Sequence, residues 1–194
     1  MRPRQKTGYF TPMYGLINKA IEDLVRSRFG DDAWHSIRTR AGLPDQPFMP
    51  LSPYDDQSTY GLVAAASAEL GAPMEAVLEQ FGTFWTEYTA VGAYGDLLNS
   101  VGSTLPEFLG NLDLMHARLK SSFPELSPPS FRVTDETPTS LVLHYHSERA
   151  GLAPLVVGML RGLGNRFGVA ISIEVARSEH PVPHDIFRVS WRTS

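Results

Sequence analysis

Apolar residues recur at helical spacing from near the start of the chain to about residue 123, and this pattern predicts a helical region. One helix is expected over 14–30 and a shorter one over 31–42, because each stretch finishes on a glycine, a residue that commonly ends helices. A proline-rich loop over 44–53 then precedes a helix expected over 58–70.

The next helix is expected to begin at Pro73, since proline suits a first helical position. A short helix is expected over 96–101. Thr104 and Glu107 then have the spacing of a capping box, which predicts one helix that continues to about Phe123. The helix after Pro73 has a wide aromatic face, more than one packing seam requires: Val77, Leu78, Phe81, Phe84, Trp85 and Tyr88.

After residue 124 the pattern changes to short apolar and alternating runs that predict strands. Strands are expected over 131–133, 141–143, 169–175 and 187–191, with one helix over 152–167 between the second and third. Helices followed by strands around one helix indicate an α+β fold, with an N-terminal helical subdomain and a C-terminal antiparallel sheet carrying a packed helix.

The 194 residues suit a single domain, which we place at 13–194, after a flexible leader over 1–12; Met13 is an alternative start. A net charge of −4 gives no sign of a nucleic-acid surface. No cysteine is present, which excludes disulfides, thiolate chemistry and covalent c-type haem attachment. The sequence has neither a signal peptide nor an apolar run long enough for a membrane span, so a cytoplasmic location is expected.

His116 is the first candidate for chemistry, because it lies on or beside the apolar stripe formed by Leu112, Met115 and Leu119. A neutral imidazole is a good iron ligand, and a single axial histidine is the usual proximal ligand of haem. The alternative is a core histidine whose hydrogen bonds are satisfied within the protein.

Tyr145, Ser147 and Arg149 are spaced by two, so in an extended chain they point to one side. Two hydroxyls and a guanidinium suit a pair of carboxylates, such as haem propionates. The alternative is a strand end with a surface arginine. Pro128 and Pro129 precede the first strand, where prolines usually only restrict the backbone, although in a haem pocket the ring could press on the macrocycle.

Two histidine pairs are further candidates: His144 with His146 on one strand face, and His180 with His184 in a loop. Either pair could bind zinc, but neither has a third ligand at a usual spacing, so we expect these histidines to be solvated or incidental. The chain shows no Ser-His-Asp order, P-loop or dinucleotide glycine motif.

Taken together, these elements resemble the H-NOX family, the haem-nitric oxide/oxygen binding domains related to the sensor domain of soluble guanylate cyclase. The resemblance runs from Met13 to about Trp191, and the Tyr-x-Ser-x-Arg element is its most specific part. Gly151-Leu152-Ala153-Pro154 and Phe84-Trp85 look most like cyanobacterial-type members. The remaining matching elements are Met13-Tyr14-Gly15-Leu16-Ile17-Asn18, Leu112-Asp113-Leu114-Met115-His116 and Pro128-Pro129.

The resemblance implies a non-covalent haem b between the two subdomains, with His116 as the proximal iron ligand. Tyr145, Ser147 and Arg149 would hold the propionates, and Pro129 would pack on the haem and distort it. The other pocket residues that it implies are Ile17, Leu78, Trp85, Leu112, Met115 and Leu155, with Trp85 and Leu155 on the distal, gas-binding side.

Oxygen-binding members place a distal tyrosine five residues after the arginine of the motif, where this chain has Pro154. The resemblance therefore implies a sensor of NO and CO that weakens O₂ binding, although Trp85 has an indole N–H to donate. NO would detach His116, and the relaxing haem would signal to a histidine kinase or a cyclic-di-GMP enzyme in another chain.

An oxygen sensor of the same fold, and a haem-free binding or scaffold domain, are the alternatives. Enzymatic catalysis is not expected, because the apolar distal side offers no general acid or base.

Overall fold

The computed structural model describes residues 13–91 and 95–193. The expected leader over 1–12 lies outside the described residues. The N-terminal part is helical, as expected, and begins with a short strand β1 (Met13–Tyr14) that pairs with β2 (Pro53–Tyr54). Its helices are α1 (Gly15–Arg40), α2 (Asp56–Leu70), α3 (Met74–Ala90), α4 (Gly95–Asn99), α5 (Leu105–Gly110) and α6 (Leu112–Ser122).

The C-terminal part is a sheet of four antiparallel strands in the order β3-β4-β6-β5. All four expected strands are present, and each is longer than its apolar run: β3 (Ser130–Thr137), β4 (Ser140–His146), β5 (Val169–Ser178) and β6 (His184–Thr193). Helix α7 (Ala153–Arg166) connects β4 to β5. The α+β architecture predicted from the sequence is confirmed.

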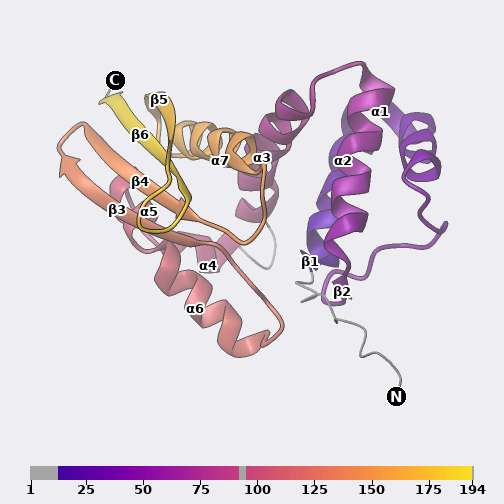
Figure 1. The fold of residues 1–194 in the computed structure, drawn as a ribbon, viewed down its shortest axis with the longest axis horizontal. Helices are drawn as coiled ribbons and strands as arrows, with labels where there is room; N and C mark the ends of the chain where they lie inside the picture. Colours follow the sequence, from indigo (N-terminus) through magenta and orange to yellow (C-terminus); the bar gives the residue numbers. More distant parts are fainter. Residues whose placement is uncertain (1–12, 92–94, 194) are drawn as a thin grey trace.

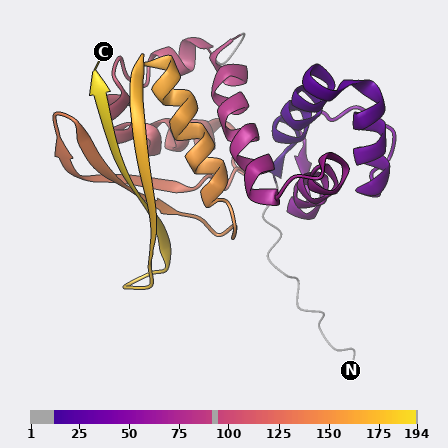
Figure 2. The same ribbon diagram turned by 90° about the horizontal axis from the view of Figure 1, so that it is seen from above.

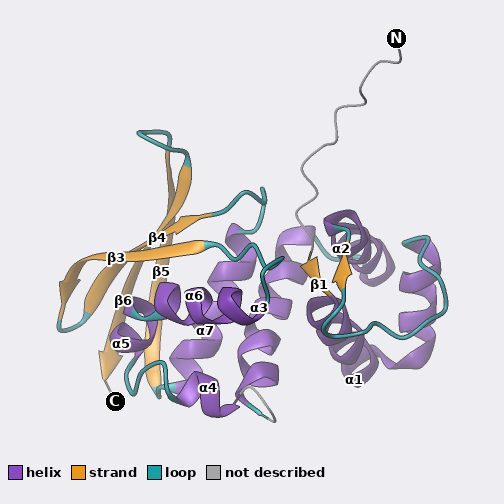
Figure 3. Ribbon diagram, turned by 90° about the horizontal axis from the view of Figure 1, so that it is seen from below, coloured by secondary structure: helices purple, strands orange, loops and turns teal. Residues whose placement is uncertain are grey.

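The elements lie in layers (Figures 1 and 2). Helix α7 covers one face of the sheet, α3 packs against α7, and α1 and α2 lie beyond α3. Figure 3 shows α6 lying alongside β3, an edge strand of the sheet. No single helix in the described part of the chain is long and apolar enough to cross a membrane; α2 and α3 pass that test only as a pair, which is bent by 112°.

Gly30 interrupts α1, as the sequence predicts. Its φ of 85° and ψ of 176° are not helical, and only glycine adopts this conformation readily. The helix axis therefore changes direction here, although hydrogen bonding makes the element continuous from Gly15 to Arg40. The β1–β2 pair was not predicted, because two-residue strands are too short to show a period.

The single helix expected after Thr104 is wrong: the chain forms two helices, α5 and α6, that meet at Asn111. The Asn111 side chain donates to the Val101 carbonyl at 2.7 Å, which fixes the junction. The predicted cap is present, since Thr104 Oγ1 accepts from the Glu107 N–H. The Glu107 carboxylate also accepts from the Ser103 N–H at 2.8 Å, one residue before the cap.

Helices α3 and α7 approach each other so closely that their backbones touch. A Cβ atom added to Gly82 would lie 2.2 Å from the Leu155 carbonyl oxygen, and one added to Gly158 would lie 2.0 Å from that of Glu79. Glycine is therefore required on both sides of the crossing. Thr83 Oγ1 donates to the Gly158 carbonyl at 3.2 Å across the same contact.

Candidate functional site

A small cavity lies where α3, α6, α7 and the sheet meet. Its volume is about 80 Å³ and its wall is almost entirely apolar. Of the residues implicated by sequence, it is lined by Trp85 from α3 and by Leu112, Met115 and His116 from α6. Side chains not expected from the sequence complete the wall: Thr86, Thr89, Leu98, Phe108, Leu109, Phe131, Leu143, Val156, Met159, Leu160, Leu163 and Arg166.

His116 reaches the cavity from α6. Its Nδ1 donates to the Pro129 carbonyl oxygen at 3.2 Å, because a carbonyl can only accept. This bond selects the tautomer in which Nε2 carries the lone pair, which is the usual arrangement of a metal-binding histidine. Burial lowers the pKa of His116, so the ring is neutral at pH 7. The geometry and protonation state both suit an axial ligand.

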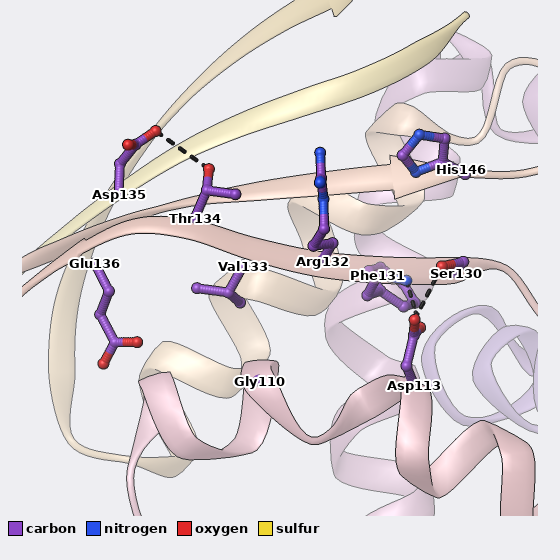
Figure 4. A pocket seen from close by; sticks show the side chains of 10 residues that line it. All are labelled: Gly110, Asp113, Ser130, Phe131, Arg132, Val133, Thr134, Asp135, Glu136 and His146. Atoms are coloured by element: carbon purple, nitrogen blue, oxygen red, sulfur yellow. Dashed lines mark hydrogen bonds between the residues drawn. The ribbon is translucent and has the colours of Figure 1, made fainter. Parts of the chain in front are cut away.

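Asp113 fixes α6 to the start of β3. Its carboxylate accepts from the Phe131 N–H at 2.5 Å and from the Ser130 hydroxyl at 2.9 Å (Figure 4). These contacts form one side of an open groove of about 530 Å³ beside β3, which His146 also lines. The helix that carries His116 is therefore held to the sheet by two side chains on neighbouring turns, Asp113 and His116 itself.

Tyr145 lies on β4 with its ring in the core, where it is 4% exposed. Its ring centroid is 5.2 Å from that of Phe131, which is in turn 5.8 Å from the His116 ring. Burial raises the pKa of Tyr145, and a hydrogen bond with Ser147 opposes this effect. Tyr145 is consequently a neutral hydroxyl donor at pH 7, connected by packing to His116.

The expected alignment of Tyr145, Ser147 and Arg149 along one extended face is wrong, because β4 ends at His146. The chain then turns, and Ser147 Oγ accepts from the Arg149 N–H at 3.0 Å. A hydroxyl that bonds to the backbone two residues later stabilises such a turn. The turn, and not strand pleating, places Arg149.

The Arg149 guanidinium already binds a carboxylate. Its Nε lies 2.9 Å from Asp56 Oδ2, at the start of α2, and its Nη1 donates to the Ser127 carbonyl at 2.8 Å. Both side chains of the ion pair are largely buried, with exposed fractions of 10% for Arg149 and 17% for Asp56. Tyr60, also on α2, donates to the Ala150 carbonyl at 3.0 Å. The turn after β4 is thus fastened to the N-terminal helices.

Sequence reasoning missed Asp56, Tyr60 and Asp113 as parts of this site. Asp56 and Arg149 are 93 residues apart, so no local spacing relates them. Asp113 was visible inside a motif of the resemblance, but its role depends on the position of β3. One Asp56 oxygen, Oδ1, is buried without a hydrogen-bond partner, which leaves this carboxylate incompletely satisfied.

The cavity wall also contains two hydroxyls, those of Thr86 and Thr89 on α3. Thr86 Oγ1 donates to the Thr83 carbonyl at 2.8 Å, and Thr89 Oγ1 donates to the Trp85 carbonyl at 2.7 Å. Both hydroxyl protons are therefore used within α3. Arg166 lies at the edge of the cavity and donates to Asn99 Oδ1 at 2.7 Å.

Seven residues implicated by the sequence lie outside the wall of this cavity: Tyr145, Ser147 and Arg149, described above, and Ile17, Leu78, Leu155 and Pro129. Ile17 and Leu155 are partly buried against the core, and Leu78 is buried at 7% exposure. Pro129 contacts the site through its carbonyl oxygen, which accepts from His116. Their contacts with a haem remain predictions.

Three of the four histidines expected to be solvated or incidental, His144, His146 and His184, form a cluster instead. His184 is 7% exposed, and its Nε2 lies 2.9 Å from His144 Nδ1. The His146 ring stacks on the His184 ring at a centroid distance of 4.2 Å. His180, the sequence neighbour of His184, is exposed. Burial, together with the nearby Arg132, lowers the pKa of His144. Among the described residues, no group of three or more His, Asp or Glu is arranged to hold a metal ion.

The donor set fits haem. His116 provides a neutral imidazole of defined tautomer, and the Arg149 guanidinium binds a carboxylate in this structure. The cavity of about 80 Å³ is smaller than the roughly 300–1,000 Å³ typical of ligand sites. The side chains of α3, α6 and α7 would therefore have to move apart to admit the macrocycle.

The chain matches one family model and is similar to soluble guanylate cyclases. The family model described as Haem-NO-binding matches residues 14–175. The soluble guanylate cyclase gcy-31 of Caenorhabditis elegans is 30% identical over 182 residues, which are 92% of this chain and 26% of that protein. The beta-2 subunit of soluble guanylate cyclase of Rattus norvegicus is 37% identical over 103 residues, 52% of this chain and 15% of that protein. The chain thus spans about a quarter or less of the length of these relatives.

Two solved structures have the same fold. An H-NOX protein from S. oneidensis in the Fe(II)NO ligation state has a TM-score of 0.81 at 21% identity, covering 93% of this chain and 100% of that one. An unliganded Fe(II) H-NOX protein from K. algicida has a TM-score of 0.81 at 20% identity, covering 94% and 98%.

Proposed function

Since the chain belongs to the Haem-NO-binding (H-NOX) family, we propose that it is a gas sensor that binds NO and CO at a ferrous haem held by His116. The observation that carries the proposal is the geometry of His116. Its ring lines the cavity, is neutral at pH 7, and has Nδ1 engaged with the Pro129 carbonyl. These are the requirements for an axial nitrogen ligand.

The remaining haem contacts follow from the same site. Tyr145, Ser147 and Arg149 would hold the propionates through two hydroxyls and one guanidinium, and Pro129 would pack against the macrocycle. Because the chain contains no cysteine, the group would be non-covalent, as in haem b. The Arg149 guanidinium would then either exchange the Asp56 carboxylate for a propionate or bind both at once.

Selectivity for NO and CO over O₂ is supported by the distal wall. The Thr86 and Thr89 hydroxyls donate to backbone carbonyls, and Pro154, in the first turn of α7, has no N–H. A polar bound gas would thus lack these donors, whereas NO and CO need none. The Trp85 indole N–H is the group that favours the alternative, an oxygen sensor of the same fold.

Signalling would begin at the contacts of α6. A ferrous haem held by His116 would supply the iron that binds NO, and binding of NO would release His116. His116, once released, would no longer tie α6 to the site, leaving Asp113 as its hold on β3. We propose that a separate protein reads this movement, a histidine kinase or a cyclic-di-GMP enzyme in trans, in the cytoplasm; relatives of this chain are guanylate cyclases.

The test uses absorption spectra of the haem-reconstituted chain in the ferrous state, without gas, under NO and in air. We expect stoichiometric haem uptake, loss of the iron–histidine bond under NO, and no stable oxygen-bound spectrum in air. His116→Gly should abolish the ferrous spectrum of the parent, and added imidazole should restore it. His35→Gly, on the exposed surface of α1, is the matched control and should leave all spectra unchanged.

An unchanged ferrous spectrum in His116→Gly would refute the ligand assignment. A spectrum of oxygen-bound haem that persists in air would support the oxygen-sensor alternative and make Trp85→Phe the next variant. Failure to take up haem would leave the haem-free binding domain as the better description.

A further inference from the structure

Tyr88 lies one helical turn after Trp85 on α3. Side chains on a helix lean towards its N-terminus, so a residue at i+3 covers the one before it. The two rings are stacked, with centroids 6.3 Å apart and an angle of 22° between their planes. On its other side Trp85 meets Phe81, at 6.1 Å and 53°. Trp85 is therefore held between two aromatic rings of its own helix.

The two rings on either side of Trp85, those of Phe81 and Tyr88, are held in place by different contacts. Phe81 is 5% exposed and belongs to the core. Tyr88 is partly buried, and its hydroxyl donates to Asp23 Oδ2 of α1 at 3.1 Å. Asp23 also forms an ion pair with Lys19, one turn earlier on α1. The position of Tyr88 consequently depends on a second helix, whereas that of Phe81 depends on general core packing.

We infer that Tyr88 is a positioning residue for the gas-binding side of the cavity: it holds Trp85 in place, and its bond to Asp23 couples that position to α1. Trp85 is the largest side chain in the cavity wall, so its orientation sets the space that a diatomic gas can enter opposite His116. The effect on gas binding rests on the proposed function, while the placement of Trp85 does not.

The expected size of the effect follows from one hydrogen bond. The net contribution of such a bond corresponds to a change of about 2- to 12-fold in an equilibrium constant. Loss of the Tyr88–Asp23 bond should shift, by this factor, the equilibrium between Trp85 stacked on Tyr88 and Trp85 in another side-chain rotamer. The rate constant for CO association should change by a similar factor.

The direct test is fluorine NMR on the full chain labelled with 5-fluorotryptophan. The chain has three tryptophans, so three resonances are expected, and Trp85→Phe identifies that of Trp85. Asp23→Ala is the decisive variant, because the contact that joins Asp23 to the tryptophan runs through Tyr88. We expect Asp23→Ala and Tyr88→Phe to shift or split the Trp85 resonance and leave the other two unchanged.

Two matched controls separate this effect from general destabilisation. Lys19→Ala removes the ion pair with Asp23 but keeps the bond to Tyr88. Tyr54→Phe removes a tyrosine hydroxyl that accepts from the Met49 N–H, away from Trp85. Both should leave the Trp85 resonance where it is. An unmoved Trp85 resonance in Asp23→Ala, or equal movement of all three resonances, would overturn the inference.

Flash photolysis of CO from the haem-loaded chain provides the second measurement. We expect Asp23→Ala and Tyr88→Phe to change the association rate constant about 2- to 12-fold, with Tyr54→Phe at the parent value. An unchanged rate with a shifted Trp85 resonance would overturn the link to gas entry and keep the positioning role. If the chain takes up no haem, the proposed function fails, and the fluorine spectra still decide the role of Tyr88.

Discussion

Gly158 stands at the crossing of α3 and α7, and substituting it with alanine tests how closely these helices pack. The added Cβ would lie 2.0 Å from the Glu79 carbonyl oxygen and 2.8 Å from its carbon. Cβ atoms in real structures keep essentially all contacts beyond about 3 Å, and here the neighbour is backbone that cannot rotate away. The helices would have to separate by about 1 Å.

The magnitude follows from two opposing effects. Inserting a methyl group into a well-packed contact costs about 1–3 kcal/mol, and a backbone neighbour places Gly158 at the upper end. Replacing a glycine inside a helix with alanine gains about 0.5–1 kcal/mol. We expect Gly158→Ala to reduce the free energy of unfolding by about 2 kcal/mol. The Thr83 hydroxyl bond to the Gly158 carbonyl would weaken with it.

Gly61→Ala on α2 is the matched control. Its Cβ would meet Ala41 at 3.9 and 4.0 Å, which is ordinary contact. Only the benefit of replacing a helical glycine with alanine remains, so this variant should raise the free energy of unfolding by about 0.5–1 kcal/mol. Urea unfolding at 25 °C should separate the two variants by about 3 kcal/mol, or roughly 6–12 °C in Tm. Equal stability of the two variants would refute the close approach of α3 and α7.

Three further predictions follow from single contacts. Asp56→Ala should lower the unfolding free energy of the haem-free protein by about 2–3 kcal/mol, because the largely buried guanidinium of Arg149 loses its carboxylate partner. The decrease should be smaller with haem bound. Equal decreases in urea titrations of both forms would contradict the proposed exchange of carboxylates. Thr104→Ala should lower the free energy of unfolding by about 1 kcal/mol through loss of the helix cap, whereas Thr104→Ser should keep most of the cap's contribution. Equal Tm values for the two variants would contradict the role of this cap. Burial keeps the pKa of His144 below its ordinary value of 6.5, so the unfolded chain binds protons before the folded one and the free energy of unfolding should fall as the pH drops below about 6.5. His144→Asn should flatten this part of the plot of unfolding free energy against pH, measured by urea titration. A plot identical to that of the parent would rule out a contribution from His144.

Much of the fold is determined by local sequence. The period of apolar residues predicted α7 and all four strands of the sheet, and Gly30 and Thr104 marked a helix break and a cap that the structure contains. These features depend on residues at most a few positions apart. Propensity, capping and periodicity act over that distance and can be read directly from the chain.

The site was only partly accessible in this way. His116 and Arg149 were recognised by residue type and by the resemblance, and the structure places His116 in the wall of the cavity. The sequence alone suggested that Arg149 continues a strand, whereas a turn held by Ser147 sets its position. Spacing by two predicts a shared face only while the strand lasts.

The sequence by itself thus determined α7, the four strands of the sheet, the break at Gly30 and the cap at Thr104, and which residue types have the chemistry for a metal and for carboxylates. Tertiary structure alone decided which of them meet: Asp56 with Arg149, 93 residues apart, and His184 with His144, 40 residues apart. The physical reason is that such contacts follow from how whole elements pack. Packing depends on side-chain volumes and close backbone approach summed over many residues, as at Gly158, and no local pattern records that sum.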